Sequence, residues 1–172
     1  MLIREPEKRI NYKNYFNHPF FNNYIESEIK ILLGNKDIRI INSYEEWYKN
    51  NKRVKFKEEY YNEKEIKENC EIRINNEIIP FSYFYKFINE GKYKIKYLFK
   101  NNLTNTCYIF YDCKSLTNIN LFNFNTQNVT NMYNMFSHCD ALEKSGIITK
   151  DENILKIINK KLLTKRKNII KY

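Results

Sequence analysis

The sequence predicts an α+β fold that combines an antiparallel β meander, a short stacked repeat and a C-terminal helix. Three observations carry this prediction. Apolar and charged residues alternate within residues 70–99, a residue pattern recurs at an offset of 26 positions within 102–147, and apolar residues follow helical spacing over 151–163. A period of two is typical of a strand with one solvated face, whereas recurrence every three to four residues is typical of an amphipathic helix.

Residues 70–99 carry the clearest strand pattern. Apolar residues at its start alternate with charged ones, and a pair of asparagines then supplies a turn. A Glu-Gly pair separates the aromatic run at 81–87 from the strand that follows, which predicts a hairpin between the two. We interpret residues 70–101 as a β meander. In its last strand, lysines alternate with apolar residues that we expect on the buried face, namely Tyr93, Ile95, Tyr97 and Phe99.

A frame of similar residues recurs within 102–147. The tetrapeptide NLTN at 102–105 returns as NVTN at 128–131, and apolar residues and cysteines follow at matching positions. The first copy also contains an approximate L-x-x-L-x-L strand motif, whose apolar side chains point into the stack between the coils of a solenoid. The predicted repeat core therefore consists of Phe110, Cys113, Leu116, Ile119, Leu121, Phe136, Cys139 and Leu142.

The segment at 25–69 is less regular, and we interpret it as a mixed linker region. Residues 38–41 have the composition of a short strand. Ser43 with Glu46 three positions later forms a capping box, which predicts a helix that continues through Trp47.

The two ends of the chain are predicted to be helical. Residues 1–24 read as a short helical piece. Residues 148–172 read as a basic C-terminal helix, whose apolar face at 151–163 covers the last repeat. An alternative for this helix is that it lies on an anionic membrane or enters a calmodulin-like groove.

The formal net charge is +10, which invites a nucleic-acid interpretation. Lysines, however, are spread through every segment, together with abundant Asn, Ile, Tyr and Phe, as an AT-rich coding sequence produces. Aromatic residues interleaved with lysine at 81–99 could stack on bases, but the favoured interpretation is an ordinary sheet with Tyr and Phe inside and Lys outside. We therefore expect no nucleic-acid partner.

Membrane, secretion and metal signals are weak. The sequence contains no run of about 18 apolar residues, the length needed to span a bilayer. The N-terminus has no apolar core of signal-peptide length. The four cysteines form no C-x-x-C pair, which favours neither a zinc site nor a disulfide framework. We expect a cytoplasmic protein with reduced thiols, no metal and no cofactor.

Residues 5–21, EPEKRINYKNYFNHPFF, resemble the end of the protein-kinase catalytic domain, where an acidic residue and Pro precede Arg, a capped helix and His-Pro-Phe. No Gly-rich loop, H-R-D-type loop or D-F-G is present. The resemblance implies a kinase C-lobe remnant at 1–24 that packs and does not catalyse. Its structural motif would consist of Arg9, His18, Pro19 and Phe20.

Residues 128–142, NVTNMYNMFSHCDAL, resemble the repeats of the BspA-like leucine-rich-repeat family, which read V-T-N-M-x-x-M-F-x-x-C-x-x-L-x-x-L-x-L. Residues 102–121 match less closely. The pattern then stops, since Ser145 and Gly146 stand where the first copy has Ile and Asn. The resemblance implies a truncated leucine-rich-repeat stub over 102–147, because a self-supporting array needs about three repeats.

These features together predict a non-catalytic protein–protein interaction module of BspA-like leucine-rich-repeat type that carries a remnant of a protein-kinase C-lobe. The alternative is the C-terminal fragment of a serine/threonine protein kinase whose catalytic part is missing from this chain. Neither interpretation assigns catalytic, cofactor-binding or metal-binding residues, and both make a protein the expected partner.

Overall fold

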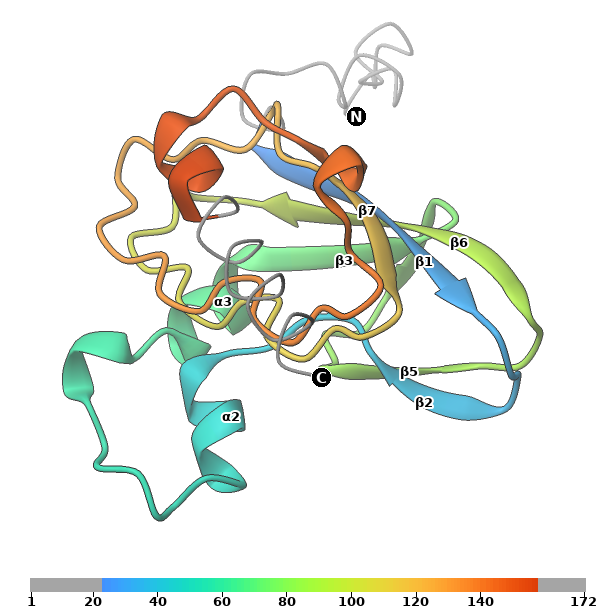
Figure 1. Ribbon diagram of the computed structural model, residues 1–172, viewed down its shortest axis with the longest axis horizontal. Helices are drawn as coiled ribbons and strands as arrows, with labels where there is room; N and C mark the ends of the chain where they lie inside the picture. The colour runs from blue at the N-terminus through green and yellow to red at the C-terminus, as the bar shows by residue number, and fades with distance from the viewer. Residues whose placement is uncertain (1–22, 158–172) are drawn as a thin grey trace, which may run out of the picture.

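The computed structural model describes residues 23–157, which form a mixed α+β fold dominated by sheet (Figure 1), so the predicted α+β class is confirmed. Within these residues, one sheet has the strand order β4-β3-β6-β1-β7-β8, and a small second sheet pairs β2 with β5. The strands are β1 (Tyr24–Ile31), β2 (Lys36–Arg39), β3 (Cys70–Ile74), β4 (Glu77–Ile79), β5 (Phe84–Phe87), β6 (Gly91–Phe99), β7 (Leu116–Asn120) and β8 (Ile147–Ile148). The helices are α2 (Tyr44–Lys49) and α3 (Glu63–Asn69), with 3-10 turns η3 (Glu58–Tyr60) and η4 (Lys144–Gly146).

Both predicted terminal helices reach beyond the described residues. Of the helical piece expected at 1–24, residues 1–22 lie outside them, and residue 24 already belongs to β1. Of the helix expected at 148–172, residues 152–157 are helical and the remainder lies outside. Ile154 is buried there. No helix among the described residues is long and apolar enough to cross a membrane.

The alternation of lysines and apolar residues is confirmed as strand β6. Ile95, Tyr97 and Phe99 are buried, and Tyr93 is half-buried against the same core. β6 pairs antiparallel with β3, and β3 turns back into β4 through two asparagines at 75–76. Both have positive φ, a conformation that asparagine tolerates in tight hairpins.

The predicted hairpin between 81–87 and β6 is wrong. β5 pairs instead with β2, in the second sheet. The reason is that both edges of β6 are already occupied, by β3 on one side and by β1 on the other. The strands at 70–101 therefore do not form a continuous meander, because β3 pairs with both β4 and β6 in the main sheet, while β5 lies in the second sheet.

The interpretation of 25–69 as a linker region is also at variance with the structure, since this segment supplies β1 to the interior of the main sheet. Along β1, Ile25, Ile29 and Ile31 are buried, and Ser27 takes the remaining inward position. After Tyr24, its outward residues are charged, and Glu28 lies 3.1 Å from Lys92 of β6. The segment therefore has the period-two pattern of a half-buried strand, which a single serine obscures.

The two copies of the 26-residue frame stack as successive coils. A parallel bridge joins Asn105 to Asn131. The backbone N–H of Thr106 donates to the carbonyl of Asn131 (2.9 Å), and that of Tyr108 donates to the carbonyl of Tyr133 (3.0 Å). These bonds satisfy the backbone of one coil with that of the next, as solenoid stacking requires.

The backbone conformation repeats with the sequence. Tyr108 and Asn134 both have positive φ, and so do Asp112 and His138, each pair separated by the same 26 positions. Asn, Asp and His enter this left-handed region more readily than other residues. Tyr108 is the unusual member, and its hydroxyl accepts a hydrogen bond from Asn134 Nδ2 at 3.0 Å.

The residues named as repeat core all lie in the main hydrophobic cluster, with side chains that are at most 3% exposed. The rings of Phe110 and Phe136 stack across the two coils with centroids 5.9 Å apart and planes 1° from parallel. The predicted repeat-core residues found in this cluster are Phe110, Cys113, Leu116, Ile119, Leu121, Phe136, Cys139 and Leu142.

The second coil continues beyond the point where its sequence pattern stops. Ile147 of β8, and not Ser145, pairs in parallel with Ile119 of β7, because η4 adds residues to the second coil. Gly146 permits this close approach, since a Cβ atom there would lie 2.3 Å from the carbonyl oxygen of Thr117.

Candidate binding surface

Residues 42–69, the cap segment, cover the outer side of the first coil with α2, η3 and α3. Asn62 bonds the cap segment to the first coil. It is buried, and its Nδ2 donates to the carbonyls of Cys107 (2.6 Å) and Asn105 (3.3 Å). Its Oδ1 accepts from the backbone N–H of Tyr44 at the start of α2 (3.0 Å). The cap segment is therefore bonded to the coil through backbone groups that would otherwise be unsatisfied.

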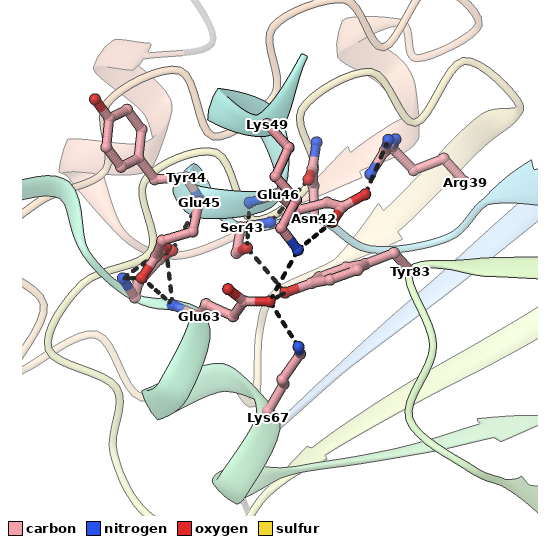
Figure 2. A network of polar contacts seen from close by, with 11 residues as sticks. Arg39, Asn42, Ser43, Tyr44, Glu45, Glu46, Lys49, Glu63, Lys67 and Tyr83 are labelled. Atoms are coloured by element: carbon pink, nitrogen blue, oxygen red, sulfur yellow. Dashed lines mark hydrogen bonds and ion pairs between the residues drawn. The ribbon is translucent and has the colours of Figure 1, made fainter. Parts of the chain in front are cut away.

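A polar network braces the cap segment against β5 and the second sheet (Figure 2). Ser43 caps α2, since its hydroxyl accepts from the N–H of Glu46 at 3.1 Å, and this part of the predicted capping box is confirmed. The same hydroxyl lies 2.9 Å from the hydroxyl of Tyr83, which donates to Glu63 Oε1 at 3.0 Å. Lys67 Nζ lies 2.6 Å from the same carboxylate.

The network holds fixed protonation states. Burial alone would raise the pKa of Glu63, but hydrogen bonds from Lys67 and Tyr83 and the charge of Lys49 outweigh it and hold that pKa below its usual value. Burial raises the pKa of Tyr83, and the neighbouring Glu63 carboxylate raises it further. An ionised carboxylate and a protonated phenol therefore face each other, an arrangement that stabilises structure and does not exchange protons near neutral pH.

Aromatic side chains gather where the cap segment meets the coils, and we call this group the aromatic face. Trp47 of α2 packs on Tyr108 of the first coil with centroids 4.6 Å apart, and Tyr60 stacks on Tyr133 of the second coil at 5.3 Å. Tyr133 is 52% exposed, so the face opens to solvent at its edge. Its members are Tyr44, Trp47, Tyr48, Phe56, Tyr60, Tyr61, Tyr108, Tyr111, Tyr133 and His138.

A cavity of about 230 Å³ adjoins the aromatic face. Arg39 enters it with its guanidinium 4.2 Å from the centroid of the Phe84 ring and 3.9 Å from Glu46 Oε1. Its Nε and Nη1 atoms are buried without an acceptor in the described part of the chain. The cavity is lined by Arg39, Asn42, Trp47, Asn50, Asn51, Tyr111, Asp112 and His138, so it offers amide and guanidinium donors between aromatic walls.

A basic loop borders the same surface. Between α2 and η3, residues 49–57 carry five positive charges and no acidic residue. All five of these side chains are exposed. An acidic partner would therefore meet both positive charge and aromatic rings here. The charges belong to Lys49, Lys52, Arg53, Lys55 and Lys57.

The four cysteines all lie among the described residues and are buried, and none forms a disulfide. Burial raises the pKa of Cys107 to about 12, and it raises the pKa of Cys113 and of Cys70 as well. The thiolate is the nucleophilic and metal-binding form, so these side chains act as apolar core. No group of three potential metal-ligating side chains occurs within residues 23–157.

We expect the folded protein to resist thiol labelling at pH 8 and to become less stable as the pH rises above about 9. The unfolded chain loses thiol protons near pH 8.5, whereas folded Cys107 holds its proton up to about pH 12. The stabilisation is thus complete below the unfolded pKa and is lost as the pH rises towards the folded one. Ellman's reagent with and without urea, and thermal unfolding between pH 7 and about 11, measure the two effects. Rapid labelling of the folded protein would contradict this assignment.

The repeat-core residues belong to the same two coils that carry Tyr108, Tyr111 and Tyr133 of the aromatic face. The other predicted motif, Arg9, His18, Pro19 and Phe20, lies outside the described residues. The sequence interpretation did not single out the aromatic face. The available signal was the density of tyrosine in two separate segments, 44–61 and 108–111, which only the fold brings together.

Comparison with protein families gives one match over the stacked coils. Residues 79–157 match the family model described as "Mycoplasma protein of unknown function, DUF285". The matched range begins at the end of β4 and contains β5 to β8 and both coils. The match is consistent with a BspA-like repeat family of unknown function. No curated protein and no solved structure matches the chain.

The DUF285 match corrects the identification made from sequence. It does not reach residues 1–24, and no comparison supports a protein kinase, so the identification as a kinase end fused to leucine-rich repeats is wrong. Of that identification, only the resemblance to BspA-like repeats agrees with the DUF285 match. The kinase-like string is short and matches a packing element alone.

Proposed function

We propose that this chain is a non-catalytic binding module whose aromatic face and basic loop take an acidic protein segment. The observation that carries the proposal is the position of partly exposed Tyr and Trp rings on a rigid support, beside five positive charges at 49–57. Lys49 pairs with Glu46 and Glu63, whereas Lys52, Arg53 and Lys55 form no ion pair among the described residues. Tyr and Trp supply large contact area at low conformational cost and are enriched among the residues that dominate protein interfaces.

Rigidity of the support favours binding over a purely structural role for these rings. Asn62 joins the cap segment to the coil, and the network around Glu63 joins it to β5. The rings are thus held in place before a partner arrives, which lowers the entropy that binding must offset. Among the tyrosines of the aromatic face, Tyr61 and Tyr133 are the most exposed, at 51% and 52%.

A selection from a displayed peptide library, scored on the purified full chain, tests this proposal. We expect acidic peptides containing apolar residues to be enriched. The double substitution Tyr61→Ala and Tyr133→Ala should weaken their binding by about tenfold or more, since such side chains each contribute about 1–2 kcal/mol at an interface centre.

The matched control replaces two other half-exposed apolar side chains, Phe122→Ala and Ile148→Ala, which lie on the β7 and β8 side of the coils and should leave binding unchanged. Equal loss in both double variants would contradict the role of the aromatic face. Tight, salt-steep binding of mixed-sequence RNA would contradict a protein as the partner.

A further inference from the structure

Two loops meet at one end of the sheets, where β1 turns into β2 and β5 turns into β6 (right-hand side of Figure 1). We call residues 32–35 and 88–90 the sheet tip. The backbone N–H of Asn35 donates to the carbonyl of Phe87 at 2.6 Å. Gly34 allows the loops to touch, because a Cβ atom there would lie 2.2 Å from the carbonyl oxygen of Ile88. The loops therefore form one rigid projection.

The sheet tip exposes three large aliphatic side chains. Leu32 is 68% exposed, Leu33 is 58% exposed and Ile88 is 66% exposed. Single exposed apolar residues need no explanation, but three at the end of one projection form a patch that water solvates poorly. None of them belongs to the hydrophobic clusters of the described residues, so the core does not require them.

Positive charge surrounds these side chains. In the β1–β6 ladder, Glu28 lies opposite Lys94, but nearest the sheet tip Lys30 lies opposite Lys92. Like charges directly opposite each other destabilise an antiparallel pair. Lys92 also forms an ion pair with Glu28 at 3.1 Å. This carboxylate offsets the charge of Lys92 and leaves that of Lys30.

The second sheet continues this positive collar. Lys36 opens β2 at the sheet tip and is exposed. Lys86 of β5 lies opposite Asp37, and Glu90 is the acidic residue within the tip itself. Four lysines therefore surround the aliphatic side chains against three carboxylates, Glu28, Asp37 and Glu90. The collar keeps a net positive charge, which favours a docking surface that carries negative charge.

We propose that the sheet tip docks on an anionic lipid surface, with Leu32, Leu33 and Ile88 entering the interfacial region and the lysines contacting phosphate headgroups. Aliphatic tips with a basic collar match both layers of such a surface, since apolar side chains partition into the acyl boundary and lysines are attracted to anionic headgroups. In Figure 1 the sheet tip lies away from α2, so a lipid surface and the proposed partner of the aromatic face can be bound together.

Co-sedimentation of the purified full chain with vesicles tests the proposal. The vesicles contain equal parts of phosphatidylserine and phosphatidylcholine, or phosphatidylcholine alone. We expect binding to the anionic vesicles and a loss of about tenfold for Leu32→Ser with Ile88→Ser. The matched control, Phe122→Ser with Ile148→Ser, removes the same kind of exposed side chain elsewhere and should retain binding.

A second pair of variants separates the collar from the overall charge of +10. Lys30→Gln with Lys36→Gln should reduce binding about tenfold, whereas Lys52→Gln with Lys55→Gln, which removes equal charge from the basic loop, should reduce it much less. Equal losses would show that only net charge matters and would overturn the proposal. Equal binding to neutral vesicles, or a dimer that the Leu32→Ser and Ile88→Ser variant dissolves, would overturn it as well.

Discussion

Replacing Phe110 by alanine is expected to lower the free energy of unfolding by about 3–5 kcal/mol. The side chain is fully buried. Its ring stacks on Phe136 of the second coil and meets the ring of Tyr97 in β6 edge-on, with centroids 5.3 Å apart. Removal of the ring therefore opens a cavity where three layers meet: the first coil, the second coil and the main sheet.

Urea unfolding followed by tryptophan fluorescence measures this loss, since Trp47 is the single tryptophan of the chain and packs on the first coil. The matched control is Phe122→Ala, because Phe122 is 50% exposed and should cost about 1 kcal/mol or less. If Phe110→Ala leaves too little folded protein to measure, Phe110→Leu should give a smaller loss of the same sign. Equal stabilities of Phe110→Leu and the unchanged protein would contradict the packing described.

Local patterns predicted the parts of this fold that repeat within a short stretch of chain. The alternation of lysine with Tyr93, Ile95, Tyr97 and Phe99 identified β6, since a period of two follows directly from strand geometry. The offset of 26 residues identified the positions that stack, because successive coils of one frame place equivalent residues above each other.

Long-range pairing was not predictable in the same way. β1 lies between β6 and β7, and its partners are distant in sequence. Its inward positions include Ser27, whose hydroxyl lies 3.5 Å from the carbonyl of Ile95, so a polar residue occupies a core-facing place. The predicted hairpin between β5 and β6 is wrong for the same reason. β1 and β3 occupy both edges of β6, and the pairing of β1 is not visible in the local sequence.

The candidate binding surface depended on the same long-range placement. Tyr60 and Tyr133 are far apart in sequence, yet their rings stack at 5.3 Å. Nothing local to either residue distinguishes it from an ordinary exposed tyrosine in a chain that contains 15 of them. What brings them together is the cap segment, and the buried amide of Asn62 is one of the groups that bond that segment to the coil, beside Asn105 and Cys107.

Replacing that amide, by Asn62→Ala, is expected to lower the free energy of unfolding by about 3–5 kcal/mol, since each buried group left without a partner costs about 1–3 kcal/mol. The substitution removes the acceptor of the Tyr44 N–H and the donor to the carbonyls of Cys107 and Asn105. These backbone groups belong to the start of α2 and to the first coil. The cap segment should therefore detach first, and trypsin should cleave the basic loop at 49–57 faster than in the unchanged protein.

Asn62→Asp separates lost hydrogen bonds from lost volume. An aspartate keeps the acceptor for Tyr44 but turns a second oxygen towards two carbonyls, so the folded state should favour its protonated form and raise its pKa. Relative to the unchanged protein, the stability of this variant should then be highest below about pH 4 and fall as the pH rises, whereas the difference for Asn62→Ala should not change in this way. Asn128→Ala, at an exposed asparagine outside the cap segment, is the matched control and should change stability by about 0.5 kcal/mol or less. Equal stability and equal trypsin sensitivity of the Asn62→Ala and Asn128→Ala proteins would mean that the other hydrogen bonds and the aromatic packing hold the cap segment without Asn62.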